Sequence, residues 1–139
     1  MQGKSTARIV VASRQGADQT VQEIKGEVIV RGSSVYIRYE EPEKGPTGGI
    51  TRTMVKITGN EIKIMRHGEI ESEQTFQAGR KLPGFYHSPF TKFHLSTDTG
   101  KLDIALDGTF GRIVWEYDLY VYDELSGHFA ISMLIEEEV

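Results

Sequence analysis

The sequence contains no cysteine, which excludes disulfide bonds, thiolate zinc sites and cysteine nucleophiles. It also lacks any apolar run near the roughly 18 residues of a membrane-spanning helix. Residues 1–3 lead directly into a mixed segment without the apolar core of a signal peptide. We therefore expect a cytoplasmic protein that does not contact a membrane.

The usual motifs of catalytic and metal sites are missing as well. The four histidines form neither His-x-His nor His-Glu-x-x-His, so no metal site is expected. Gly45, Gly48 and Gly49 are not followed by the Lys-Ser/Thr pair of a phosphate-binding loop, and no Gly-x-Ser-x-Gly elbow occurs. We expect no cofactor and no catalytic residue. An enzyme that pairs His87 with a neighbouring carboxylate is the alternative.

The chain also has no excess of positive charge. Its formal net charge is -4 and its pI is about 5.6. Such a surface does not attract phosphate backbones, so nucleic acid is not an expected partner. The alternative is a surface that binds single-stranded nucleic acid through Tyr36, Tyr39 and nearby basic residues. These basic residues are Arg52, Lys56, Lys63 and Arg66. The plainer interpretation is that they pair with glutamates on neighbouring strands.

What the sequence does contain is a two-residue alternation of apolar and polar side chains. It is clearest in two runs, which are Ile113, Trp115, Tyr117, Leu119 and Val121, and then Phe129, Ile131, Met133 and Ile135. This period predicts strands with one apolar and one polar face. About eight to ten such strands, joined by short Gly-rich turns, predict an all-β, antiparallel up-and-down β-barrel. Residues 1–139 are expected to form a single domain.

Several segments carry signals for turns and irregularities. Gly26 predicts a bend or a bulge, and turns are expected at residues 98–100 and 126–127. Residues 83–89 are expected to form a short, irregular edge. The longest loop covers residues 41–49. Its prolines and glycines predict a disordered connection, and a mobile lid over the barrel mouth is the alternative.

Arg66 is the most distinctive candidate for a functional role. By alternation it shares the inward face with Ile62 and Ile64, where a guanidinium needs a partner or a wet cavity. It either anchors an anionic ligand or is a structural residue. In the structural role it would stack on Trp115 or pair with a glutamate.

Aromatic residues gather in the segment expected at the barrel rim. Tyr86 and His87 lie there together with Phe85 and Phe90. Because small barrels admit ligands at their mouths, Tyr86 and His87 are predicted to supply polar contacts. The apolar lining is expected to come from Val55, Ile57, Ile64, Phe93, Leu95, Trp115, Tyr117 and Met133.

Short motifs follow one another in a recognisable order along most of the chain. They are Tyr39-Glu40-Glu41, Thr53-Met54-Val55-Lys56-Ile57, Arg66-His67-Gly68, Phe76 with Gly79, Tyr86-His87-Ser88-Pro89, Thr97 and Tyr117-Asp118-Leu119. From Thr6 to Glu136, their order and spacing resemble the YwiB-like family of small bacterial proteins, a domain of unknown function. The resemblance implies a lipocalin-like, calycin-type β-barrel and supplies no reaction.

The leading functional prediction is a noncatalytic, lipocalin-like barrel that binds a small apolar or anionic ligand. Its expected ligand-binding residues are Arg66, Tyr86, His87, Trp115 and Tyr117.

The alternative prediction is a protein-interaction module whose barrel is filled by its own side chains. Such a module would bind a partner protein or associate with itself as a homodimer. The expected contact face contains Phe110, Tyr120 and Tyr122, which fall opposite Trp115 by alternation.

Overall fold

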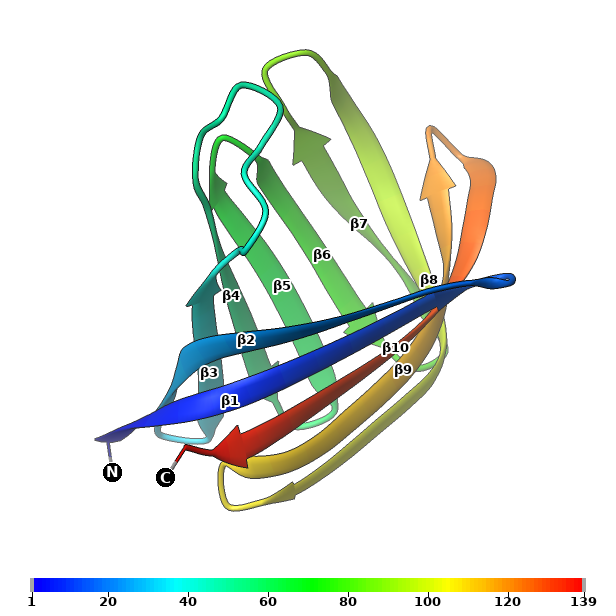
Figure 1. Ribbon diagram of the computed structural model, residues 1–139. Helices are drawn as coiled ribbons and strands as arrows, with labels where there is room; N and C mark the ends of the chain where they lie inside the picture. The colour runs from blue at the N-terminus through cyan, green and yellow to red at the C-terminus, as the bar shows by residue number, and fades with distance from the viewer. Residues whose placement is uncertain (1, 139) are drawn as a thin grey trace.

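The fold is that of a computed structural model, which describes residues 2–138. This part of the chain forms ten strands and contains no helix (Figure 1). It follows that no helix within these residues has the length and apolar character needed to cross a membrane. The strands are β1 (Gln2–Gln15), β2 (Asp18–Arg31), β3 (Ser34–Glu40), β4 (Thr51–Thr58), β5 (Glu61–Gly68), β6 (Glu71–Gln77), β7 (Arg80–His87), β8 (Lys92–Asp107), β9 (Phe110–Val121) and β10 (Glu124–Glu137).

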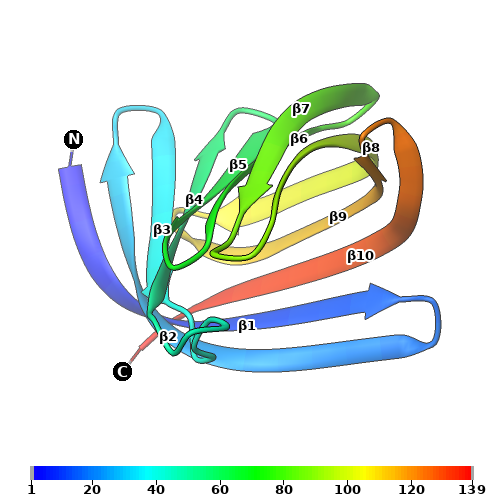
Figure 2. The same ribbon diagram turned by 90° about the horizontal axis from the view of Figure 1, so that it is seen from above.

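The strands form one antiparallel sheet that closes on itself. Each strand pairs with its sequence neighbours, and β1 pairs with both β2 and β10. The β1–β10 ladder runs from Ala7 opposite Glu137 to Arg14 opposite Ala130. Figure 2 shows the ring of strands from above. The all-β, up-and-down barrel expected from the alternation is therefore confirmed.

The two-residue period sorts side chains between the inside and the outside of the barrel. Of the predicted lining residues, six are at most 8% exposed, and they are Val55, Ile57, Leu95, Trp115, Tyr117 and Met133. Ile64 and Phe93 also face inward but are half-buried. The prediction of an apolar inner face is confirmed for all eight.

Aromatic rings pack the interior of the barrel. The centroid of the Phe76 ring lies 5.6 Å from that of Trp115 and 4.7 Å from that of Tyr117. Tyr117 also stacks on Phe129 at 5.4 Å. Such ring pairs stabilise the fold beyond their buried area. The barrel is therefore filled around these rings by its own side chains.

The strand β7 separates from β6 over most of its length. The two strands pair only between residues 71–73 and 85–87. Where they part, the Thr97 hydroxyl of β8 donates to the Thr75 carbonyl of β6 at 2.6 Å. Pro83 has no N–H and lies where β7 lacks its β6 partner, which is where a strand tolerates proline. The segment expected to be irregular is thus largely a strand paired with β8.

The turn predicted at residues 98–100 is wrong. The strand β8 continues to Asp107, and its pairing with β9 shifts between Thr99 and Lys101. Gly100 is therefore the extra residue of a β-bulge, which bends the strand without reversing it. The glycine was a correct signal of irregularity but not of a turn.

The turn predicted at residues 126–127 is also misplaced. The chain reverses at Tyr122 and Asp123, whose φ angles are 48° and 66°. Two-residue hairpins need such left-handed angles, and glycine or asparagine usually provides them. The turn therefore carries no sequence signal, and the expected Ser126-Gly127 turn is instead a register shift within β10.

Gly26 lies where β3 joins the sheet. The strand β2 pairs with β1 along its length but with β3 only from Glu27 onward. No register shift occurs at Gly26, so the predicted bulge is absent. A Cβ atom at this position would lie 2.7 Å from the Arg38 carbonyl oxygen and 2.7 Å from Ile9 Cδ1. The residue is glycine because β3 and β1 approach it closely.

We expect Gly26→Ala to lower the free energy of unfolding by about 1–3 kcal/mol, because the methyl group overpacks this contact. Urea denaturation measures the change. Gly100→Ala is the matched control, since no atom lies within 4 Å of its added Cβ. Equal losses in the two variants would contradict the close approach at Gly26.

Candidate functional site

A partly exposed ion pair lies on the inner surface of the barrel. Arg66 of β5 donates from Nε to Glu41 Oε2 at 2.7 Å and from Nη2 to Oε1 at 2.8 Å. The hydroxyl of Thr53 on β4 donates to the same carboxylate at 2.6 Å. Solvent still reaches the pair, because 29% of the Arg66 side chain and 20% of the Glu41 side chain are exposed. The sequence allowed Arg66 to anchor an anionic ligand, stack on Trp115 or pair with a glutamate. The structure shows the pairing with a glutamate.

The ion pair holds both of its members in their charged forms. Burial alone would raise the pKa of Glu41, but the hydrogen bonds from Arg66 and Thr53 outweigh it and lower that pKa below its ordinary value. Burial likewise works against the Arg66 charge, while Glu41 outweighs it and raises the pKa of the guanidinium. The inner surface therefore carries one fixed positive and one fixed negative charge at neutral pH.

Arg66 belongs to a row of inward-facing polar side chains. The cross-strand register aligns Tyr39, Thr53, Arg66, Ser72 and Tyr86 in that order across five strands, and we call these residues the polar wall. Tyr86 stacks on Phe93 of β8 with ring centroids 5.0 Å apart. Burial and the nearby Glu41 charge raise the pKa of Tyr39 to about 12. Its hydroxyl thus stays protonated at neutral pH and can donate a hydrogen bond.

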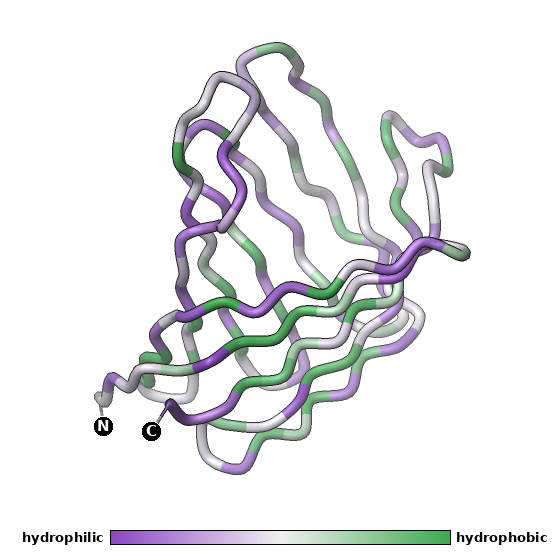
Figure 3. Tube along the Cα trace, in the orientation of Figure 1, coloured by the Kyte–Doolittle hydropathy of each residue, from purple (hydrophilic) through white to green (hydrophobic). Residues whose placement is uncertain are grey.

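The strands across the barrel supply inward apolar side chains that also keep solvent contact. Figures 1 and 2 show β1, β9 and β10 on the side opposite β4–β6. Their half-buried inward residues are Val11, Leu119, Phe129 and Ile131, which we call the apolar wall. The tube in Figure 3 shows the apolar character of these strands. We use "mouth" for the polar and apolar walls together.

The predicted ligand-binding residues fall into three groups. Arg66 and Tyr86 lie in the polar wall, on either side of Ser72. Trp115 and Tyr117 are 1% and 8% exposed, so they belong to the packed interior. His87 points outward, because consecutive strand residues face opposite sides, and its ring lies 4.8 Å from Phe85. The structure therefore brings only Arg66 and Tyr86 together.

Glu41 is the site residue that the sequence interpretation missed. It directly follows β3, in the alternation of Val35, Ile37 and Tyr39, which places it on the inward side. The same parity argument that marked Arg66 would have found it. The proline that follows Glu41 marks it as the first residue of a loop, and this hides its place in the alternation of β3.

The loop at residues 41–50 is ordered and tied to the next loop of the barrel. Gly48 N donates to Gly45 O at 3.0 Å, and Gly45 N donates to Gly49 O at 2.9 Å, which forms a tight turn. The carboxylate of Glu69 accepts hydrogen bonds from Gly49 N at 2.6 Å and from the backbone and hydroxyl of Thr47. The disordered connection expected from composition is therefore wrong. Glu41 and Glu69 hold the loop at its start and at its tip.

Histidine and acidic side chains within residues 2–138 form no group of three that could hold a metal ion. Glu71 and Glu73 lie on the outward face of β6, and Glu69 precedes this strand. Two buried polar atoms of the interior, Trp115 Nε1 and Thr99 Oγ1, have no hydrogen-bond partner among the described residues.

We expect Glu69→Ala to free the loop tip, because three hydrogen bonds to it are lost. Tryptic cleavage after the exposed Lys44 should then become faster, which a time course followed by mass spectrometry measures. Glu73→Ala is the control, since its carboxylate pairs with Lys63 at 3.2 Å and does not contact the loop. Equal cleavage rates in both variants would show that Glu69 does not hold the loop.

We expect Glu41→Gln to lower the free energy of unfolding at pH 7 by about 1–2 kcal/mol, because Arg66 loses its charged partner. The folded pKa of Glu41 is lowered, so the pair contributes fully above the unfolded pKa of about 4.3. The contribution is lost as the pH falls through the folded pKa. The difference between wild type and variant should therefore shrink on acidification.

Urea denaturation at a series of pH values tests this dependence on Glu41. The neighbouring Glu40→Gln variant is the control, because Glu40 is exposed and outward-facing. A stability difference for Glu41→Gln that stays constant down to acid pH would contradict the assignment.

Comparison with known proteins supplies the family. Residues 6–133 match the family described as "Domain of unknown function (DUF1934)". The "Uncharacterized beta-barrel protein YwiB" of Bacillus subtilis (strain 168) is 33% identical over 96 residues, which are 68% of this chain and 65% of that protein. The crystal structure of the ywiB protein from Bacillus subtilis matches with a TM-score of 0.77 at 25% identity, over 99% of this chain and 94% of that one. The YwiB-like resemblance is thus confirmed, and the chain belongs to the DUF1934 family.

Proposed function

We propose that this protein is a noncatalytic binding protein that takes a small, partly apolar anion into the mouth of its barrel. The single observation that carries the proposal is the position of Arg66. Its guanidinium lies on the inner surface, half-buried and reached by solvent, among the neutral hydroxyl groups of the polar wall. A charge costs free energy in such a place unless a partner meets it. We propose that an anionic ligand is such a partner of Arg66. Binding of a small ligand inside the barrel is the lipocalin-like function expected from the sequence.

The chemistry of the polar wall favours a carboxylate or a similar planar anion. The Glu41 carboxylate accepts two parallel hydrogen bonds from Arg66, which is how a guanidinium recognises a ligand carboxylate. The hydroxyl of Tyr39 adds a neutral donor nearby. A ligand carboxylate would displace Glu41, and the loop that begins at Glu41 would move with it. Glu41 is then an internal competitor of the ligand.

The apolar wall favours a ligand that also carries a hydrocarbon part. Val11, Leu119, Phe129 and Ile131 face inward and are only half-buried, so a ligand can cover their remaining exposed area. The rings of Phe76, Trp115 and Tyr117 fill the interior next to this wall. This packing limits how deeply the hydrocarbon part can enter the barrel.

Decanoate is a suitable probe, with 1-decanol and acetate as the neutral and the chainless comparisons. We expect decanoate to bind and the other two to bind much more weakly, as measured by calorimetry and by the fluorescence of the single tryptophan, Trp115. Arg66→Met should weaken decanoate binding at least about tenfold, since a charge-assisted hydrogen bond contributes roughly 1.5–3 kcal/mol. Glu41→Gln should tighten it, because the internal competitor loses its charge.

The double variant Arg66→Met/Glu41→Gln separates binding from folding. It removes both charges and leaves no unpaired ion on the inner surface, so it should fold and yet fail to bind. Equal affinity of the wild type for decanoate and 1-decanol would contradict the role of Arg66. Absence of binding by all three compounds would overturn the proposed function.

A further inference from the structure

The outer face of β1, β10 and β9 is apolar where the outside of an antiparallel barrel is usually polar. Uncharged outward side chains adjoin one another on these strands, and we call them the outer apolar face: Val10, Ala12, Val114, Ala130, Ser132 and Leu134. All six keep some exposure. Arg14, Arg112 and Glu116 border this face in the same cross-strand rows. Elsewhere the outer surface is covered by ion pairs such as Lys63–Glu73 and Arg38–Glu27. A contiguous apolar surface of this kind indicates an interface.

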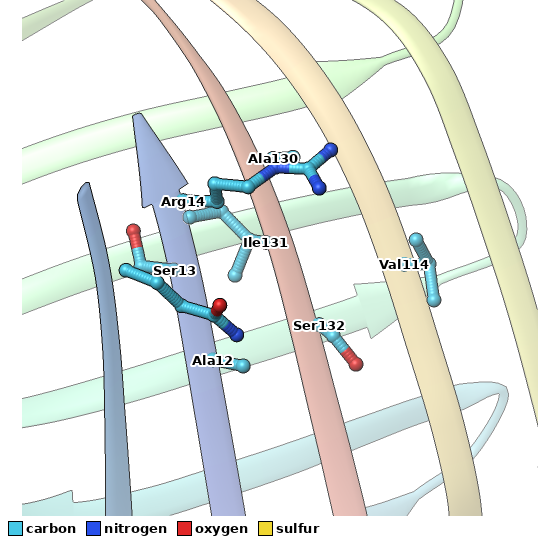
Figure 4. A pocket seen from close by; sticks show the side chains of 8 residues that line it. Ala12, Ser13, Arg14, Val114, Ala130, Ile131 and Ser132 are labelled. Carbon is cyan, nitrogen blue, oxygen red and sulfur yellow. The ribbon is translucent and has the colours of Figure 1, made fainter. Parts of the chain in front are cut away.

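The small residues of this face leave a shallow hollow. It has a volume of about 160 Å³ and lies between β2, β1, β10 and β9. Figure 4 shows Ala12 and Ser132 at the hollow, with Val114 on one side and Arg14 extending across β10 at Ala130. Val21 pairs with Ala12 from β2, and its side chain is 62% exposed beside the hollow. The face thus combines a cavity with an adjacent protruding apolar side chain.

A second copy of the chain fits this face because the charges along its register complement each other. In one cross-strand row, Arg14 and Glu116 lie on opposite sides of Ala130. In the next row, Ala12 and Val114 lie on opposite sides of Ser132. A two-fold axis along β10 exchanges β1 with β9. This symmetry places Arg14 of one copy against Glu116 of the other at two equivalent positions. Between these two positions, apolar side chains of one copy meet apolar side chains of the other.

Further out, the same symmetry sets Glu136 of β10, which pairs with Arg8 at 2.9 Å, against its own copy, and sets Val21 against Asp103. Gln19 of one copy meets Lys101 of the other, and Glu23 meets Ala105. The structure records no ion pair for Arg14 within residues 2–138, so Arg14 is available to a partner. Glu116 is held only by the exposed ring of His128 at 3.3 Å. At the outer apolar face, β1, β10 and β9 are paired on both sides, so two copies that use this face meet face to face.

We propose that two copies of this protein form a dimer through the outer apolar face, about a two-fold axis along β10. Ala12 of each copy packs against Val114 of the other, and Arg14 pairs with Glu116 across the interface. This surface differs from the aromatic one expected from sequence. Phe110 packs against the core, the Lys81 ammonium covers the Tyr120 ring at 3.8 Å, and the Tyr122 hydroxyl donates to Lys92 O at 3.0 Å.

Sedimentation of the full chain over a range of concentrations tests the dimer. We expect a species of twice the 15.6 kDa chain mass. Ser132 lies on the axis and faces its own copy, so Ser132→Glu should raise the dimer dissociation constant roughly a hundredfold by opposing two like charges. Thr75→Glu is the matched control, since Thr75 faces outward on β6, opposite Lys63. It should leave the dimer intact.

Charge reversal identifies the interface independently of any effect on folding. Arg14→Glu alone and Glu116→Arg alone should both weaken the dimer, because each sets like charges against each other. The double variant Arg14→Glu/Glu116→Arg should restore it. A wild-type monomer at every concentration would overturn the proposal, and so would a dimer that neither Ser132→Glu nor the charge reversals weaken. Because these residues face outward, decanoate binding in the mouth should be unaffected in all variants, so this test is separate from that of the proposed function.

Discussion

The pairing of β1 with both β2 and β10 is the constraint on which the rest of the structure depends. It joins the two ends of the strand sequence and turns an open meander into a closed barrel. Closure gives each strand an inner and an outer face, so a two-residue alternation becomes a division between core and surface. It also satisfies the backbone groups of strands that would otherwise be edges. Where a strand is paired on both sides, contact between copies comes from side chains on its outer face.

The inside of the barrel combines two environments with different physical requirements. Around Phe76, Trp115 and Tyr117 it is a packed core, where stability comes from removing apolar area from water and from ring contacts. At the mouth, Arg66 and Glu41 keep their charges on the inner surface, and burial opposes both. A half-buried pair adds little to stability compared with apolar residues of the same volume. The proposed function gives this pair a role in recognition.

The outer surface is equally divided. Much of it carries charged side chains, and of the basic residues near Tyr36 and Tyr39, Lys63 pairs with Glu73 and Arg66 pairs with Glu41. The loop at residues 41–50 is held to the barrel by Glu69, another outward carboxylate with a specific contact. The outer face of β1, β10 and β9 departs from this pattern, since alanine, valine, leucine and serine adjoin one another there between the charged residues Arg14, Arg112 and Glu116. The two proposed surfaces, one inside the barrel and one outside, share no residue.

The sequence by itself determined the strands, their inward faces and the inward position of Arg66, because alternation is a local property of each strand. By the same rule, Tyr86 and His87 are consecutive strand residues and therefore face opposite sides of the barrel wall. Only the tertiary structure decided that Glu41 is the partner of Arg66, that Gly100 is a bulge and that the chain reverses at Tyr122. These features depend on the register between strands, which results from closing the whole barrel. No short stretch of sequence contains that information.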